Sequence, residues 1–199
     1  MRTWRQFFVW LDDRTGYHRL LLPIRRRMLP AGPSWEYSTA SCLLWILVVQ
    51  LITGLLLMAT YSPSVTSAWA SVHYIEQSGY GSFIRGLHHY ASHALIILFA
   101  IHTIRVLLRA GFRPPGELIW VTGLLLIPLV IVWAITGNPL AGTVKGMAQI
   151  EVEGSIIGST PVIGPLIRRI LLGGDDVGHL TLTHLYFLHV GLILSLIHI

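Results

Sequence analysis

The chain has 199 residues, of which 53% are hydrophobic and only 12% are charged. A soluble domain carries about 25% charged residues, so this composition indicates an integral membrane protein. The formal net charge is +5, but the arginines stand beside apolar stretches, which favours a membrane topology over nucleic-acid binding. The single cysteine, Cys42, excludes an internal disulfide and a cysteine-only metal site.

The order of apolar and polar stretches predicts an all-α membrane protein. Residues 3–29, within an N-terminal region 1–33, combine an aromatic side with arginines and are predicted to form an amphipathic helix in the membrane interface. The region 34–199 is predicted to be a four-transmembrane-helix bundle. Its spans are expected at about 38–60, 83–109, 116–136 and 180–199, the fourth being too short to cross fully. Residues 61–83 and 137–178 are expected to be a loop and a long connector rich in glycine and proline.

The basic residues predict the orientation of the bundle. The first 30 residues contain seven arginines, and the loop after the second span contains Arg105, Arg109 and Arg113. The loop between the first two spans contains no arginine or lysine. By the positive-inside rule, the N-terminus and the second loop face the cytoplasm and the 137–178 connector lies outside.

Two histidines of the second span carry the main functional signal. His88 and His102 are 14 residues apart, almost four helical turns, so both side chains lie on one face, roughly 21 Å apart along the axis. A histidine inside a bilayer is costly and needs a partner. Two histidines on one stripe at this separation predict two stacked haems with histidine axial ligands.

The fourth span supplies the expected partner of His88. His189 stands near its outer start, and imidazoles on facing helices at one depth can clamp a haem iron from both sides. His88 and His189 are therefore expected to form the outer site and His102 the inner site. A partner of His102 would fall at position 203 or 204, so the inner haem is expected to be incompletely ligated in this chain, since His198 points away from the stripe. The remaining histidines are interpreted as interfacial or hydrogen-bonded.

Two arginines and one glycine are further candidates for cofactor binding. Arg85 and Arg105 lie one turn outside His88 and His102, where guanidinium groups can pair haem propionates; for both, an anchoring role at the membrane interface is the alternative. Gly54 would let the first span approach a flat macrocycle, and ordinary helix packing explains it equally well.

These residues belong to runs that resemble a known family. The chain is similar to the N-terminal, haem-bearing half of cytochrome b from quinol–cytochrome c reductase (bc-type) complexes, in particular the split form of chloroplasts and bacteria. The similarity rests on QLITG (50–54), PSVTSAWASVHYI (63–75), the run from GSFIRGLHHY to RPPGELIWVTG (81–123), ITGNPL (135–140), STPVIGPL (159–166) and VGHLTLTHLYFLH (177–189). The resemblance implies four helices that hold two b haems, with His88 and His189 on the outer haem and His102 on the inner haem.

The resemblance also implies the setting of the protein. It would be an electron-transfer subunit in the bacterial inner membrane that works between quinol oxidation and quinone reduction. Its partners would be a Rieske iron–sulfur protein, a c-type cytochrome and a C-terminal cytochrome b half (subunit IV), in a homodimer of complexes.

The chain departs from the family pattern at several positions. Ser38 replaces the cysteine that tethers an extra haem in the split form, Leu140-Ala141-Gly142 replaces a Leu-Pro-Trp motif, and His184 replaces an arginine before the fourth helix. The family's fourth helix continues past His189, and residues 194–199 resemble translated adapter DNA. We therefore expect residues 194–199 to be foreign and the native protein to continue in their place.

Two other functions are compatible with the residues alone. A dihaem membrane anchor of a dehydrogenase or hydrogenase also uses histidines on helices, although the GFRPPGELIWVTG loop and the long outer connector are not expected in one. A non-redox scaffold or transporter is the third reading, and it predicts no haem absorbance.

Overall fold

The computed structural model describes residues 2–16, 35–114 and 116–197. Within these ranges every regular element is a helix, which confirms the all-α fold class. The chain divides into two compact units, residues 1–38 and 39–199. Among the described residues, three helical segments are long and apolar enough to cross a membrane, Ser38–Met58, Gly79–Leu108 and Glu117–Ala141. The chain is therefore an integral membrane protein.

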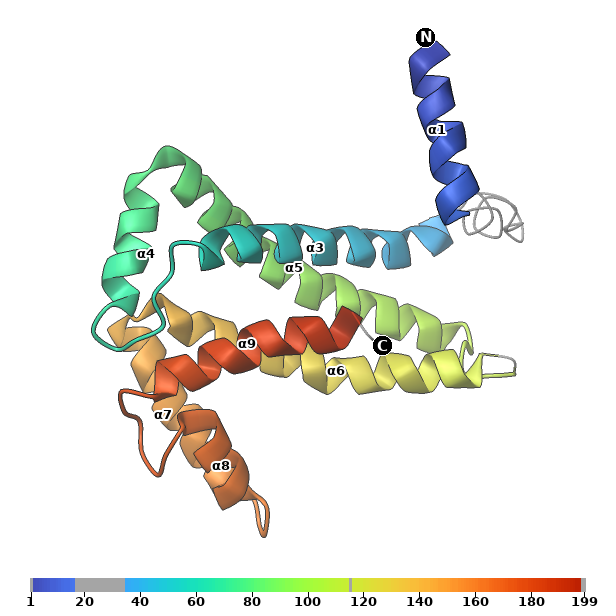
Figure 1. Ribbon diagram of the computed structural model, residues 1–199. Coiled ribbons are helices and arrows are strands. Elements are labelled where there is room, and N and C mark those ends of the chain that lie inside the picture. Colours follow the sequence, from blue (N-terminus) through green and yellow to red (C-terminus); the bar gives the residue numbers. More distant parts are fainter. Residues whose placement is uncertain (1, 17–34, 115, 198–199) are drawn as a thin grey trace. The chain divides into compact units, whose positions relative to one another are not determined.

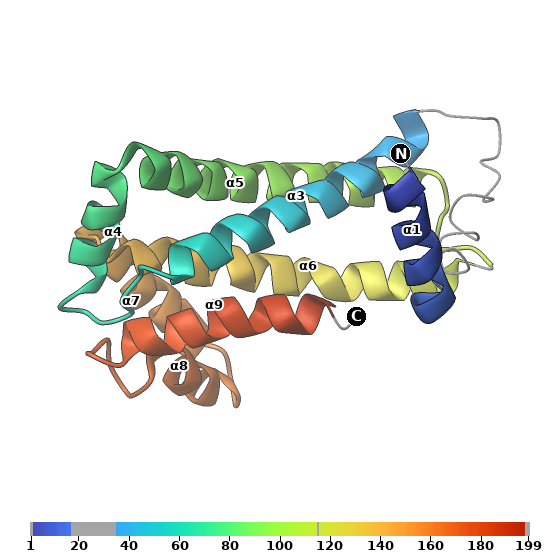
Figure 2. The ribbon, with the colours of Figure 1, turned by 45° about the horizontal axis from the view of Figure 1, so that its top comes forward.

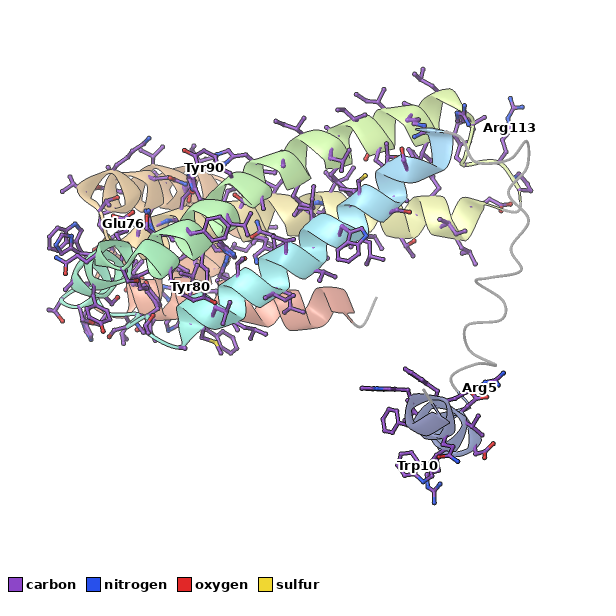
Figure 3. The ribbon with its side chains drawn as sticks, turned by 90° about the horizontal axis from the view of Figure 1, so that it is seen from above. Arg5, Trp10, Glu76, Tyr80, Tyr90 and Arg113 are labelled. Atoms are coloured by element: carbon purple, nitrogen blue, oxygen red, sulfur yellow. The ribbon has the colours of Figure 1, made fainter. Side chains whose placement is uncertain are left out.

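The first unit contains the helix α1 (Arg2–Thr15). Its aromatic side chains are exposed, and Trp10, which projects from the helix in Figure 3, lies under the guanidinium of Arg14 at 4.5 Å. The chain leaves the helix at Gly16, whose φ of +61° is the left-handed conformation that glycine adopts readily. The prediction of one helix over 3–29 is thus wrong at this point, and residues 17–29 lie outside the described part of the chain.

Four helices of alternating direction run side by side in the bundle (Figures 1 and 2). They are α3 (Trp35–Met58), α5 (Gly79–Leu108), α6 (Glu117–Gly137) and α9 (Thr181–Ile197). Many of their apolar side chains point outward: Trp45 is 70% exposed and Leu108 is 81% exposed. Such an apolar exterior is typical of helices that face lipid or partner helices.

Short helices form a cap at one end of the bundle, where the sequence predicted a loop and a connector (Figure 1). They are α4 (Ala68–Gln77), the 3₁₀ helix η1 (Asn138–Ala141), α7 (Val144–Gly158) and α8 (Gly164–Leu172). The glycines and polar residues that suggested irregular structure act as helix caps. The Thr143 hydroxyl accepts a hydrogen bond from the Gly146 amide at 3.1 Å, and Gly173 ends α8 with φ +74°.

Two apolar clusters hold these elements. The cap packs around six buried side chains, Ala68, Ile150, Leu171, Leu172, Leu182 and Leu185. A second cluster joins α3, α5 and α6 at mid-depth through Leu43, Leu95, Val130 and Trp133. Gly142 follows η1 and packs against the start of α4. Only glycine fits at this position, since its φ is +65° and a Cβ would lie 2.6 Å from the Trp69 amide nitrogen. The cap therefore sits firmly on the end of the bundle that carries His88 and His189.

Candidate functional site

A cavity of about 280 Å³ lies between the four bundle helices, at the end that the cap covers. Its wall is mostly aliphatic and aromatic, and both His88 and His189 line it. Arg85 and Gly54 line it as well, so the cavity gathers four of the six site residues expected from the sequence. His102 and Arg105 are not part of this wall and lie toward the other end of α5.

The His88 and His189 rings both line the cavity and lie close together in an edge-on arrangement. Their centroids are 6.3 Å apart and their planes make an angle of 72°. With metal–nitrogen bonds of about 2 Å and ring nitrogens about 1 Å from each ring centre, two imidazoles on opposite sides of one metal place their centroids roughly 6 Å apart. The observed separation therefore matches two axial ligands of a single metal ion.

Hydrogen bonds leave the same nitrogen of both rings available. The Thr53 hydroxyl donates to the Val49 carbonyl at 2.6 Å, so its oxygen accepts from Nδ1 of His88 at 2.8 Å. Nδ1 of His189 lies 3.0 Å from the Trp133 carbonyl, which can only accept. Both rings thus carry their proton on Nδ1. The lone pair of each neutral ring is on Nε2, the state and orientation in which an imidazole binds a metal.

Glycines give both rings their positions. A Cβ at Gly54 would lie 3.3 Å from Cε1 of His88, and a Cβ at Gly137 would lie 2.7 Å from Cε1 of His189. The second distance is shorter than real Cβ contacts, so only glycine fits beside His189 without a shift. Gly54, which the sequence predicts to make room for a flat macrocycle, lies beside the ring of His88.

Sequence reasoning missed the threonines and Gly137, although a repeated signal marks them. The tripeptide Ile-Thr-Gly occurs at 52–54 in α3 and at 135–137 in α6. In both copies the threonine lies within hydrogen-bond distance of Nδ1 of a cavity histidine, at 2.8 Å for Thr53 and 3.3 Å for Thr136. The repeat therefore builds matching supports on the two sides of the cavity.

His102 has an equivalent support near the other end of the bundle. Its Nδ1 lies 2.9 Å from the hydroxyl oxygen of Thr39, and Arg105 donates to the same oxygen at 3.1 Å. Thr39 and Thr53 are 14 residues apart, as are His102 and His88. The helices α3 and α5 therefore form two threonine–histidine pairs of the same kind. The apolar cluster that contains Leu43 lies between the two pairs along the helices.

Charge at the cavity is confined to one side chain and its partner. Arg85 is the only Arg, Lys, Asp or Glu among the described residues that line the cavity. Its guanidinium donates to the carboxylate of Glu76, in the last turn of α4. Within the described ranges, no three His, Cys, Asp or Glu side chains converge as a metal cage. A pair of imidazoles suits an iron whose other four ligands come from a macrocycle.

Tyr61 closes the cavity beside the cap. Its hydroxyl donates to the Leu140 carbonyl at 2.8 Å, and its ring lies 5.5 Å from that of Tyr186. Burial raises the pKa of Tyr61, and the neighbouring Tyr186 acts in the same direction. The phenol therefore stays protonated and serves as a neutral donor that ties α3 to the cap.

The other described histidines do not face the cavity pair. His184 binds the Ile170 carbonyl at 3.2 Å through Nδ1 and is absent from the cavity wall. His73 stacks on Trp69, and His93 binds the His89 carbonyl. His89 reaches the cavity edge but is exposed. His18 and His198 lie outside the described residues.

Comparisons with known proteins agree on one family. The family described as Cytochrome b/b6/petB matches residues 26–199. Cytochrome b6 of Gloeobacter violaceus is 33% identical over 183 residues, which is 92% of this chain and 85% of that protein. Cytochrome b6 of Trichodesmium erythraeum is 31% identical over 92% of this chain and 82% of that protein.

A solved structure shares the fold. A chain of a hyperthermophilic respiratory complex III superposes with a TM-score of 0.78 at 20% identity, over 95% of this chain. The present chain spans 51% of that chain's length. The chain therefore belongs to the cytochrome b/b6 family, and the matches and the helical bundle fit the N-terminal half of a split cytochrome b.

Proposed function

We propose that the chain is the haem-bearing electron-transfer subunit of a quinol:cytochrome c (bc-type) oxidoreductase, carrying electrons across the membrane between a quinol oxidation site and a quinone reduction site. The observation that carries the proposal is the pair of His88 and His189 rings, which line one cavity with their centroids 6.3 Å apart and their Nδ1 atoms hydrogen-bonded to the protein. Membership of the cytochrome b/b6 family supports the same assignment.

The cavity residues have separate tasks in this proposal. His88 and His189 hold the iron of the outer b haem, and the threonine and carbonyl acceptors at Nδ1 fix their tautomers. The mostly apolar wall excludes water from the site. Arg85 lines the cavity, and its guanidinium, which also donates to Glu76, would pair a propionate. When bound, a b haem supplies a one-electron carrier whose potential the protein tunes through ligands, burial and nearby charge.

His102 is proposed to hold the inner b haem, with Thr39 orienting its ring and Arg105 beside it. The inner site is the one toward the basic loop between α5 and α6, where Figure 3 shows Arg113. By the positive-inside rule, this end and the N-terminus face the cytoplasm of a bacterial cell. The α1 helix, with exposed aromatic residues and arginines, is proposed to lie in the membrane interface.

The proposed partners follow from the family. They are a Rieske iron–sulfur protein, a c-type cytochrome and a C-terminal cytochrome b half, in a homodimer of complexes. A capped outer end suits this arrangement, since α7 and α8 present exposed aliphatic residues such as Ile156 and Leu166 away from the bundle.

A reduced-minus-oxidised spectrum of membranes that contain the chain tests the proposal. We expect a b-type α band, and we expect His88→Ala and His189→Ala to remove the same spectral component, because each leaves the iron with one protein ligand. Loss of different components would refute the pairing. Co-purification with a Rieske protein supports the bc-type assignment, and co-purification with a dehydrogenase or hydrogenase subunit would instead support the membrane-anchor alternative.

A further inference from the structure

The corner between α4 and α5 places a carboxylate beside Arg85, the only Arg, Lys, Asp or Glu side chain among the described residues of the cavity wall. Ser78 leaves the helical conformation with ψ +131°, and its hydroxyl accepts from the Gly81 amide at 3.0 Å, which starts α5. The corner is tight, since a Cβ at Gly81 would lie 2.2 Å from the Ile75 carbonyl oxygen. This turn brings Glu76 onto Arg85, nine residues further along the chain. Figure 3 shows Glu76 at this end of the bundle.

Arg85 is shared between the corner and the cavity. Its guanidinium donates to Glu76, while the side chain lines the wall that also contains His88, one turn further along α5. Glu76 itself is not part of the wall. The pair is half-buried, with 36% of the Arg85 side chain and 45% of the Glu76 side chain exposed. An ion pair this exposed adds little to stability, but it sets the net charge next to the cavity wall that Arg85 lines.

We propose that Glu76 is a positioning and charge-setting residue for the outer haem: it holds the Arg85 guanidinium at the cavity and lowers the reduction potential of that haem. The inference rests on the proposed function and goes beyond it, because it assigns a role to a residue outside the cavity. Reduction adds one electron to the iron, so a nearby positive charge favours the reduced state and a negative charge opposes it. Glu76 contributes one negative charge next to Arg85, and without it the outer site becomes more positive by one unit.

The effect should be specific to the outer haem. Arg85 is the only charged Arg, Lys, Asp or Glu side chain in the described cavity wall, so no neighbouring carboxylate there offsets a change at Glu76. His102 is 17 residues beyond Arg85 on α5, roughly 25 Å along the helix axis. Because the Coulomb energy falls with distance, the charge change acts much less on a haem at His102 than on one at His88, which is one turn from Arg85.

Spectral redox titration of the complete haem-loaded protein tests the inference. At a fixed ambient potential, Glu76→Gln is expected to raise the ratio of reduced to oxidised outer haem at least about threefold, equivalent to about 28 mV at 59 mV per decade. Glu76→Lys, which changes the charge by two units, is expected to shift it further in the same direction. Glu76→Asp keeps the charge and is expected to restore the parent value. Where an inner haem is bound, it should titrate as in the parent protein in all three.

The matched control is Glu151→Gln, which removes an exposed carboxylate of α7 in the same cap, away from Arg85. Three results would overturn the inference: no shift in both Glu76→Gln and Glu76→Lys with the outer haem retained, an equal shift in Glu151→Gln, or loss of the outer haem in every Glu76 variant including Asp. Failure of the proposed function gives a different result, since the parent chain itself would then show no b-type absorbance.

Discussion

Replacement of Gly137 by alanine should selectively disable the outer site. The new Cβ would lie 2.7 Å from Cε1 of His189, and ordinary contact begins at 3.4 Å, so the ring must retreat by about 0.7 Å. Nδ1 of the ring is held by the Trp133 carbonyl at 3.0 Å, and this retreat strains or breaks that bond. Loss of a group that orients a metal ligand typically lowers metal affinity about 10–100-fold. We expect the outer haem affinity of Gly137→Ala to fall within this range.

Two other glycines turn this prediction into a graded series. At Gly54 the neighbouring ring needs to move only about 0.1 Å, so Gly54→Ala should have a much smaller effect. At Gly86, two residues before His88, a Cβ meets nothing within 4 Å, so Gly86→Ala should bind haem as the parent chain does. Glycine-to-alanine changes in helices favour the helix by about 1 kcal/mol, so lost binding cannot be assigned to a weakened helix. Haem titration followed in the Soret band measures the series. Equal losses in Gly86→Ala and Gly137→Ala would refute the steric argument.

Three further predictions concern other parts of the chain. Thr53→Val should weaken the outer haem about 10–100-fold and Thr39→Val the inner haem, each without affecting the other, as resolved by potentiometric titration of each haem. Burial raises the pKa of Glu153, although its hydrogen bond with Gln149 acts in the opposite direction. The protonated form therefore stabilises the fold below about pH 4.5, and this stabilisation is lost as the pH rises through the folded-state pKa. We expect Glu153→Gln to raise the Tm at pH 7 and to leave it unchanged at pH 4. All haem should be extracted by acidified acetone, because Ser38 cannot form a thioether, and a haem-stained band after denaturing electrophoresis would show that the exposed Cys42 forms one.

The histidine stripe was predictable because it depends only on helix periodicity. His88 and His102 lie 14 residues apart in one mostly apolar stretch that is long enough to cross a membrane, and such a stretch is predicted to be helical. The meeting of His88 with His189 followed from two spans that run in the same direction with histidines near their outer starts. Haem ligation at these residues remains a prediction.

The periodicity of apolar residues could not predict the cap or the ion pair between Glu76 and Arg85. The elements α4, α7 and α8 are short, and the glycines and polar residues at their ends are equally typical of loops. The contact of Glu76 with Arg85 depends on the sharp corner at Ser78, which no apolar pattern encodes. The threonine supports were missed because a threonine in an apolar helix usually binds its own backbone, as Thr53 does, and its second contact depends on how two helices pack.

The threonine–glycine pairs of α6 also locate a further place in the bundle. Thr136–Gly137 faces His189 in α9, and Thr122–Gly123 precedes it by 14 residues on the same face of α6. Because α6 and α9 run in opposite directions (Figure 1), 14 residues earlier in α6 corresponds to 14 residues later in α9, which is position 203. At Gly123 a Cβ meets nothing within 4 Å, whereas at Gly54 and Gly137 it meets a histidine ring.

This geometry makes a quantitative prediction for the inner site. His102 has its supporting threonine, but no described residue of α9 reaches the level of Thr122. The 199-residue chain should therefore hold one bis-histidine haem, at His88 and His189. A chain extended in the helical register, with a histidine at position 203, should hold a second low-spin haem. Pyridine haemochrome assays of haem per polypeptide, together with low-temperature spectra, distinguish one low-spin haem from two. Two low-spin haems in the 199-residue chain would mean that another residue ligates the inner iron, and the threonine–glycine pairs would then not mark ligand positions.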